Sequence, residues 1–309
     1  MKNKVMILIL VVCTLLFTGT VHARSLKSAK EPIDLSKICE LTLDYSSDGV
    51  SFAGISVKLY KIASVSENCR YTLTDNFAAS NVTINGITSQ SEWNTVRTTV
   101  ESFVYSSGVG PVCESVIAED GSLKFSGLDT GLYFVPAVIA EHDGFRYYFQ
   151  SAIISLPDLN EDGTWNYSVE ADPKPDVRPP SSTDLEYKVV KLWKGDGKLT
   201  RPADVTIDII KDGEVVATVV LSDDNGWSYT WNAADDGSVW TVAERNVAAG
   251  YTVSVDKNET TFSVINTYDK PPVDAPQTGD TYNIGLYIVL MCVSGIGLVL
   301  FGIKRKSEA

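Results

Sequence analysis

The chain has 309 residues, a length that accommodates two ordinary domains. Its 39 acidic residues outnumber its 26 basic residues, and the net charge is -13. An acidic surface repels nucleic acid and keeps a protein solvated. The composition therefore argues against a nucleic-acid partner and favours a solvated extracellular protein.

Residues 1–23 have the pattern of a secretory signal peptide. Basic residues precede an apolar run over residues 5–17, and the small residues at 21–23 suit signal peptidase. The mature chain is therefore expected to start near Arg24. The polar residues 24–36 are expected to form a disordered lead-in.

Three cysteines remain after removal of the expected processed ends, namely Cys39, Cys69 and Cys113. An odd number without a Cys-x-x-Cys pair argues against a disulfide scaffold and against a zinc site. One disulfide with one buried thiol stays open, and the spacing does not indicate which two cysteines would pair.

Residues 37–174 are predicted to form a first domain made mainly of strands. Apolar residues alternate over residues 39–45, a second strand is expected over 55–62, and two more short runs lie within 121–135. The domain is therefore expected to be a sandwich of β-sheets.

One segment of the first domain predicts a helix instead. Apolar residues recur at helical spacing over residues 91–105, and Ser91 is the expected N-cap. The helix is expected to pack against the sheets through its apolar face. That face consists of Trp93, Val96, Val100, Phe103 and Val104.

Residues 158–163 begin like a calcium-binding loop, with the sequence Asp-Leu-Asn-Glu-Asp-Gly. The bidentate glutamate that such a loop needs at its twelfth position is replaced by Val169. We therefore interpret the segment as a polar hairpin between strands, and we expect no metal or cofactor.

A spacer and a second domain follow. Residues 175–183 are rich in proline and lack periodicity, which predicts a semi-rigid extended spacer. Residues 184–270 contain short strands separated by turn residues, including a Lys211-Asp212-Gly213 hairpin, and predict a β-sandwich. The expected strands are residues 187–193, 204–210, 214–221, 226–231, 238–244, 250–255 and 260–267.

Three of these strands carry a polar residue on the face predicted to be buried. Lys191 lies between apolar residues of the same parity, Glu244 continues the apolar face of the fifth strand, and Asn266 continues that of the last strand. An unpaired buried charge costs several kcal/mol, so the three side chains need a shared explanation. The alternative is that each polar group is satisfied separately.

The end of the chain predicts a membrane span behind a short motif. The motif Ala275-Pro276-Gln277-Thr278-Gly279 lies in a linker over residues 271–280. Residues 281–303 are uncharged and long enough for one transmembrane helix, and the basic tail over residues 304–309 is expected on the cytoplasmic side.

This order of motif, span and basic tail resembles the cell-wall sorting signal of Gram-positive surface proteins, whose usual motif is Leu-Pro-x-Thr-Gly. The resemblance implies that a sortase cleaves between Thr278 and Gly279 and transfers the threonyl carbonyl to an amine on peptidoglycan or on another subunit. The membrane helix is then discarded. Ala275 stands where the family has leucine, which leaves open which sortase reads the signal. The alternative is an ordinary single-pass anchor.

Several phrases of the first domain resemble pilins and collagen-adhesin B-type domains, above all the last phrase. It is similar to the pilin motif Trp-x-x-x-Val-x-Val-Tyr-Pro-Lys and matches it at Trp165, Val169, Pro173 and Lys174, although the second valine and the tyrosine are absent. The resemblance implies that the amine of Lys174 resolves the sortase acyl-enzyme and joins one subunit to the next. The alternative is an incidental exposed lysine.

The three polar residues of the second domain stand in phrases that resemble the B-type domain family. The phrases are Val-Val-Lys-Leu-Trp around Lys191, Trp-Thr-Val-Ala-Glu ending at Glu244, and Ile-Asn-Thr-Tyr around Asn266. The resemblance implies an isopeptide bond between Lys191 and Asn266, with Glu244 polarising the carbonyl and moving protons. In the first domain Lys37 shares the parity of the buried face but Asn166 does not, so we predict no such bond there.

The sequence thus predicts an all-β protein of two tandem Ig-like or prealbumin-like β-sandwiches, with one helix inserted in the first. We expect a secreted, sortase-processed pilus subunit without enzymatic activity, joined covalently through Lys174 and Thr278. Its expected partners are sortase, peptidoglycan, other pilin subunits and, before processing, the membrane. The alternative is a monomeric wall-anchored adhesin whose first domain binds a host or matrix ligand.

Overall fold

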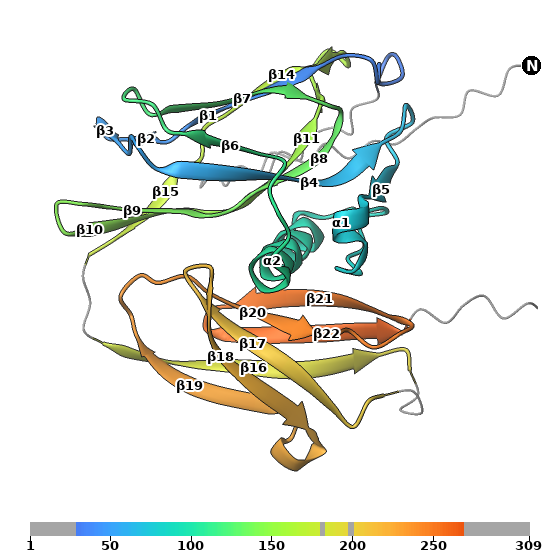
Figure 1. Ribbon diagram of the computed structural model, residues 1–309, viewed down its shortest axis with the longest axis vertical. Coiled ribbons are helices and arrows are strands. Elements are labelled where there is room, and N and C mark those ends of the chain that lie inside the picture. The colour runs from blue at the N-terminus through green and yellow to red at the C-terminus, as the bar shows by residue number, and fades with distance from the viewer. Residues whose placement is uncertain (1–28, 180–182, 197–200, 269–309) are drawn as a thin grey trace, which may run out of the picture. The chain divides into compact units, whose positions relative to one another are not determined.

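A computed structural model describes residues 29–179, 183–196 and 201–268 (Figure 1). The expected signal peptide, sorting motif, membrane span and basic tail lie outside these residues. Among the helices of the described part, none is both long enough and apolar enough to cross a bilayer. The described residues form two β-rich domains, so the predicted all-β class is confirmed, and we describe each domain by itself.

The first sandwich contains three sheets, two short hairpins and two helices in its described part. One sheet has the order β14 (Ser168–Ala171), β1 (Cys39–Asp44) and β7 (Ser122–Leu128). The central sheet has the order β11 (Ala152–Leu156), β8 (Gly131–Val135), β4 (Ser56–Val65) and β5 (Tyr71–Leu73), and β6 (Cys113–Val116) also pairs with β4. The third sheet has the order β15 (Pro175–Arg178), β10 (Phe145–Phe149) and β9 (Val138–His142). The hairpins are β2 (Ser46–Ser47) with β3 (Val50–Ser51), and β12 (Asp158–Leu159) with β13 (Trp165–Asn166).

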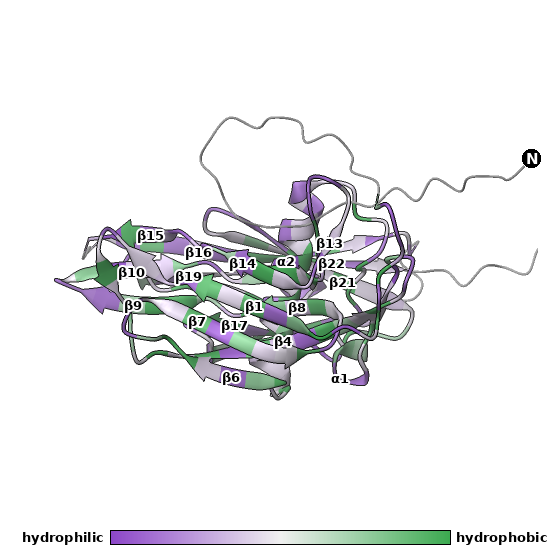
Figure 2. Cartoon of the chain, turned by 90° about the horizontal axis from the view of Figure 1, so that it is seen from above, coloured by the Kyte–Doolittle hydropathy of each residue, from purple (hydrophilic) through white to green (hydrophobic). Residues whose placement is uncertain are grey.

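Strand β8 of the central sheet is buried on both faces. Every residue of β8 is buried, and successive side chains of a strand point to opposite faces. Tyr133 packs in one core with Leu41 of β1, whereas Phe134 packs in a second core with Val100 of the helix α2 (Gln90–Ser107). This double burial explains the uninterrupted apolar run of β8. Elsewhere apolar and polar residues alternate, as along β7 and β17 in Figure 2.

The predicted helix is confirmed, but its N-cap differs from the expectation. The cap is Ser89, whose Oγ accepts a hydrogen bond from the Glu92 backbone N at 3.2 Å, while Oε2 of Glu92 accepts one from the Ser89 backbone N at 2.8 Å. This reciprocal pair is a capping box, which satisfies donors at the helix end better than Ser91 could. A further short helix, α1 (Asp75–Ala78), was not predicted.

Replacing Ser89 with Ala is expected to lower the free energy of unfolding by about 1 kcal/mol, because the backbone N of Glu92 loses the Oγ acceptor that caps α2. Urea denaturation of the purified protein measures this change. Ser91→Ala is the matched control, since Ser91 lies one residue inside the helix and is exposed, and its effect is expected to stay within about 0.5 kcal/mol. Equal effects of the two substitutions would show that Ser89 is not the cap.

Part of the lead-in expected to be disordered is instead ordered. Ile33 is only 3% exposed, and its backbone N donates to Glu67 O at 3.1 Å. The indole Nε1 of Trp165 donates to the carbonyl oxygen of Glu31 at 2.8 Å. The burial of Ile33 and these hydrogen bonds therefore fix this part of the lead-in. The polar composition of the segment did not predict this order.

The spacer expected over residues 175–183 begins as a strand. Strand β15 pairs antiparallel with β10, and its residue Val177 lies opposite Tyr147. Proline is compatible with an edge strand because the extended backbone suits its fixed φ and only the missing N–H is lost. Residues 180–182 of the spacer lie outside the described part.

The segment that begins like a calcium loop is a hairpin, as predicted. Asp158 of β12 pairs with Asn166 of β13, and Oδ1 of Asp162 accepts a hydrogen bond from the backbone N of Thr164 at 2.9 Å. The carboxylate therefore closes the turn. Within the described residues, no group of three or more His, Cys, Asp and Glu side chains is arranged to hold a metal ion.

The three cysteines of the described chain, Cys39, Cys69 and Cys113, are free thiols. Burial raises the pKa of Cys39 and of Cys69 to about 11. The thiolate is the reactive form of cysteine, so these two side chains are poor nucleophiles at neutral pH.

The second sandwich contains all seven predicted strands in two sheets. One sheet has the order β19 (Ser228–Ala234), β16 (Asp184–Lys194), β22 (Thr261–Tyr268) and β21 (Tyr251–Asn258). The other has the order β18 (Glu214–Ser222), β17 (Asp204–Lys211) and β20 (Trp240–Arg245). A short 3-10 helix, η1 (Asp223–Asn225), follows β18. The core between the sheets includes Val189, Ile207, Leu221, Val242, Phe262 and Val264.

Two features of this sandwich fix how its strands are aligned. The turn between β17 and β18 has positive φ at Asp212 (49°) and Gly213 (85°), which matches a tight hairpin turn and fixes the register of the two strands. Strands β16 and β22 are the first and last of the sandwich and run parallel, with Lys191 opposite Val264 and Trp193 opposite Asn266. The two ends of the domain therefore lie on neighbouring strands.

Candidate functional site: a buried amine, carboxyl and carboxamide

The structure brings together the three polar residues that the sequence places on buried faces. Lys191 lies on β16 and Asn266 on β22 of one sheet, whereas Glu244 lies on β20 of the other sheet. The exposed fraction of the side chain is 0% for Lys191 and 1% for Glu244, and Asn266 is 0% exposed. The three groups thus meet in the core between the sheets.

The carboxyl group of Glu244 contacts both nitrogen atoms. Its Oε2 lies 3.4 Å from Nζ of Lys191, and its Oε1 accepts a hydrogen bond from Nδ2 of Asn266 at 2.9 Å. Nζ of Lys191 also donates to the carbonyl oxygens of Leu192 at 3.2 Å and Val264 at 3.3 Å. One carboxyl group therefore bridges an amine on the first strand and a carboxamide on the last.

The carbonyl oxygen Oδ1 of Asn266 is buried without a hydrogen-bond partner in the described structure. An unsatisfied buried acceptor costs about 1–3 kcal/mol. A half-turn of the carboxamide exchanges Oδ1 and Nδ2, which are nearly isosteric, and would let a protonated Glu244 donate to Oδ1. In the orientation that the structure shows, Glu244 contacts the nitrogen of the carboxamide, and only the turned orientation would place the carbonyl oxygen against it.

Burial shifts the titration of both ionisable groups toward their neutral forms. Burial lowers the pKa of Lys191 to about 8, although the negative charge of Glu244 opposes the shift. Burial also raises the pKa of Glu244, opposed by Lys191 and by the hydrogen bond from Asn266. Desolvation penalises each charge separately, so the neutral amine and the neutral acid become accessible near neutral pH.

The residues of the predicted pilin motif separate into core and surface positions. Val169 is buried in the core of the first sandwich, and Trp165 is half-buried. Lys174 lies between β14 and β15, and 58% of its side chain is exposed. Its Nζ forms an ion pair with the carboxylate of Asp172. The amine is thus accessible at the end of a strand, as the acceptor role requires, whereas Pro173 sets the extended path of the chain before it.

The polar residues considered in the first sandwich do not form a similar cluster. Lys37 is exposed, and its Nζ lies 4.7 Å from the ring centroid of Tyr167. Oδ1 of Asn166 accepts a hydrogen bond from the backbone N of Ser168 at 3.0 Å. The sorting-motif residues 275–279 lie outside the described residues.

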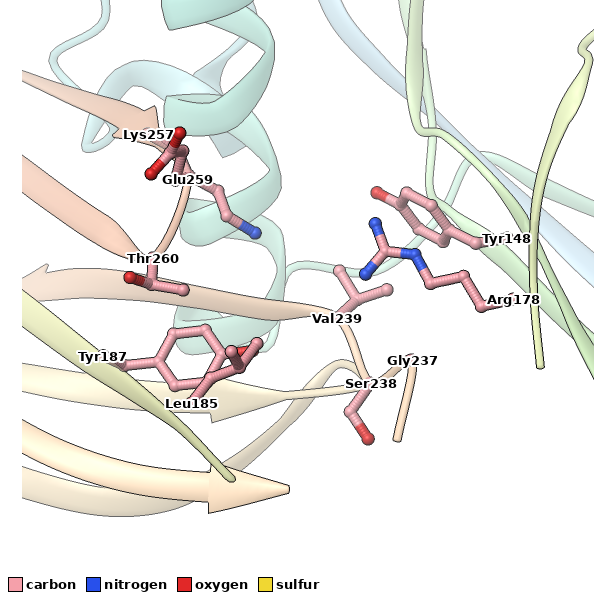
Figure 3. A pocket seen from close by; sticks show the side chains of 10 residues that line it. All are labelled: Tyr148, Arg178, Leu185, Tyr187, Gly237, Ser238, Val239, Lys257, Glu259 and Thr260. Atoms are coloured by element: carbon pink, nitrogen blue, oxygen red, sulfur yellow. The ribbon is translucent and has the colours of Figure 1, made fainter. Parts of the chain in front are cut away.

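Figure 3 shows a pocket of about 300 Å³ beside β16 and β21. Its lining includes Leu185 and Tyr187 of β16 and Lys257 of β21, but none of the three clustered residues. The buried cluster therefore does not open into this pocket, although Glu244 is among the residues that line a different pocket.

Sequence reasoning missed the residues that surround the amine. Trp193 is one of the apolar residues that flank Lys191 with the same parity, and its ring centroid lies 4.2 Å from Nζ of Lys191. The available signal was the spacing of two residues along β16, which places both side chains on one face. The contacts of Asp196 and Arg201 with this region depend on the chain after β16, and the sequence contains no pattern that predicts them.

The second domain is thus a β-sandwich whose first, fifth and last strands contribute a lysine, a glutamate and an asparagine to one buried cluster. Residues 187–267 match the family model of the Cna protein B-type domain, and this match covers most of the second sandwich. A collagen adhesin of Staphylococcus aureus is 32% identical over 81 residues, which cover 23% of this chain and 7% of that protein.

Solved structures were also compared with the chain. A single B repeat unit of the collagen-binding surface protein of Staphylococcus aureus is 15% identical to this chain, with a TM-score of 0.27. The match covers 76% of this chain and 100% of the chain of the repeat unit. The full-length major pilin SpaD of Corynebacterium diphtheriae is 11% identical, with 77% and 99% covered and a TM-score of 0.28. The pilus backbone RrgB of Streptococcus pneumoniae is 15% identical, with 78% and 79% covered and a TM-score of 0.26.

Proposed function

We propose that the protein is a structural subunit displayed on the surface of a Gram-positive cell, and that an isopeptide bond between Lys191 and Asn266 reinforces its second sandwich. The observation that carries this proposal is the burial of an amine, a carboxyl and a carboxamide in direct contact. Three polar side chains in an apolar core cost stability unless they react or are fully paired.

The bond would form in a single turnover. The neutral Nζ of Lys191 attacks Cγ of Asn266, the new Nζ–Cγ bond replaces the Cγ–Nδ2 bond, and Nδ2 leaves as ammonia. Glu244 contacts both the attacking nitrogen and the departing nitrogen, so it can take a proton from the first and give one to the second. The protons balance, and no external reagent is required.

The location of the bond gives it a mechanical role. It would connect β16 and β22, the first and last strands of the sandwich, which are already neighbours in one sheet. Tension applied through the two ends of the domain would then pass through a covalent amide instead of a ladder of hydrogen bonds. A covalent link of this kind suits a subunit that bears load.

The second part of the proposal is covalent assembly at the cell wall. Lys174 would accept the threonyl carbonyl of Thr278 from another subunit, with sortase as the processing enzyme and peptidoglycan as the final anchor. The exposed amine at the end of β14 supports this role. The alternative function is a monomeric wall-anchored adhesin for a host or matrix ligand, which the similarity to a collagen adhesin favours.

The rate of isopeptide formation is expected to depend on pH. The rate should rise as Lys191 loses its proton, with a midpoint near the pKa of about 8, because only the neutral amine is nucleophilic. Loss of the proton from Glu244 opposes the reaction, and burial raises the pKa of this carboxyl, so its neutral form persists to a higher pH than in an exposed glutamate. Protein kept unfolded in urea and refolded at different pH values, with intact mass recorded over time, measures this profile. A rate that does not change between pH 6 and pH 9, about two units below to one above the midpoint, would contradict it.

A further inference from the structure

The ring of Trp193 packs against the amine of Lys191. Nζ of Lys191 lies 4.2 Å from its ring centroid, within the range of a cation–π contact. The ring is held at its edges by Trp227 and Tyr251, whose centroids lie 5.4 Å and 5.2 Å away in T-shaped arrangements. An aromatic face attracts the ammonium form but accepts no strong hydrogen bond, so it does not compete for the amine after deprotonation.

A second cation lies against the same ring. The guanidinium carbon of Arg201 lies 5.5 Å from the centroid of Trp193. Arg201 forms a two-point ion pair with Asp196, in which Nη2 donates to Oδ1 at 2.8 Å and Nε donates to Oδ2. The Asp196 side chain is only 2% exposed, and the hydroxyl of Tyr251 donates to its Oδ2 at 3.0 Å. Fork-like Arg–carboxylate pairs fix orientation as well as charge.

We propose that Trp193 is a positioning residue for the Lys191–Asn266 cross-link, and that the Asp196–Arg201 pair is a latch that holds its ring against the amine. This inference rests on the proposed isopeptide function. The long, flexible stem of a lysine has many rotamers, and a fixed ring face restricts Nζ to the region next to Glu244 and Val264. The latch would thereby shorten the search for the reactive geometry.

The charges around the amine give the latch a second effect. Burial is the main cause that lowers the pKa of Lys191, and the positive charge of Arg201 lowers it further, whereas Glu244 and Asp196 raise it. Removing the charge of Arg201 would leave Asp196 unopposed, so the pKa of Lys191 should rise. A larger fraction of the amine would then be protonated at neutral pH, and attack would be slower.

Arg201→Gln is expected to slow ammonia loss during refolding about tenfold and to shift the midpoint of the rate against pH upward. The chain offers a matched control, Arg245→Gln. Arg245 also donates through Nε to a buried carboxylate of the same sandwich, Asp208, at 2.6 Å, but it does not contact Trp193. Arg201→Lys retains the positive charge but cannot form the two-point pair with Asp196. This variant is expected to react more slowly, with the same midpoint of the rate against pH as the protein without substitutions.

The ring itself is tested by Trp193→Phe and Trp193→Leu, with Phe expected to retain more of the rate because it retains an aromatic face. If Arg201→Gln matches Arg245→Gln in rate and pH midpoint, or if the Phe and Leu variants react at the same rate, the latch proposal is overturned while the cross-link stands. If the unmodified chain never loses ammonia, the cross-link itself fails. If Arg201→Gln does not fold, the comparison of Trp193→Phe with Trp193→Leu still tests whether the ring positions the amine.

Discussion

The protein without substitutions is expected to be lighter by one ammonia than the mass calculated from its sequence. Lys191→Ala is expected to abolish this deficit. The amine is the nucleophile, so no other side chain in the cluster can replace it. Glu244→Gln is expected to slow the reaction by about 10²–10⁴, because the amide is nearly isosteric but cannot move protons between the two nitrogens. Intact mass spectrometry of the folded protein measures both effects.

Lys191→Ala should also lower the stability of the second sandwich by a large amount. A covalent link between residues 191 and 266 restricts the unfolded chain much as a disulfide does, which for a loop of this length is worth about 4 kcal/mol. Loss of the link is therefore expected to lower the melting temperature of the second sandwich by roughly 20 °C. Lys188→Ala is the matched control, because Lys188 lies on the same strand with its side chain exposed, and it should retain both the deficit and the melting temperature.

Two results would contradict the proposed bond. One is a full calculated mass for the unmodified, folded protein. The other is a mass deficit that persists after Lys191 is replaced, which would place the ammonia loss at another residue. A fall in melting temperature without any mass deficit in the parent would show that the three groups stabilise the core only by pairing.

Lys174→Arg is expected to convert a ladder of covalent multimers in the cell-wall fraction into a single species. Arginine keeps a positive charge beside Asp172, but its guanidinium stays protonated and cannot attack an acyl-enzyme. Lys124→Arg is the matched control, because Lys124 is similarly exposed, at 53%, and its Nζ pairs with Glu40 at 3.0 Å on the same sandwich. A denaturing gel of wall extracts from cells that produce each variant gives the readout.

The outcomes of this experiment separate the two functions. A ladder lost with Lys174→Arg and retained with Lys124→Arg supports assembly through Lys174. A ladder that survives both substitutions excludes Lys174 as the acceptor and leaves another lysine to be found. A single band from the unmodified protein supports the monomeric adhesin instead.

Much of the second sandwich could be predicted from local pattern alone. Its strands have a period of two, so the buried face can be read from alternate residues, and this parity also identified Lys191, Glu244 and Asn266 as inward-facing. The hairpin turn at Asp212 and Gly213 has its own chemical signature. These features depend on neighbours within a few residues, which is why the amino-acid sequence determined them.

Other features were decided only by tertiary structure, because they depend on residues far apart in the chain. The burial of Ile33 and the pairing of β15 with β10 each required a partner that no local pattern specifies. The capping box at Ser89 is different, because Glu92 lies three residues away and the Ser-x-x-Glu pattern is visible in the sequence. The parallel pairing of β16 with β22 decided which polar groups meet.

The amino-acid sequence by itself thus determined which side chains of the second sandwich face inward, since strand parity is a local property. Only the tertiary structure decided what those side chains touch. The fold placed the carboxyl group of Glu244 between two nitrogens and the ring of Trp193 against one of them, because packing distances are set by all the elements at once.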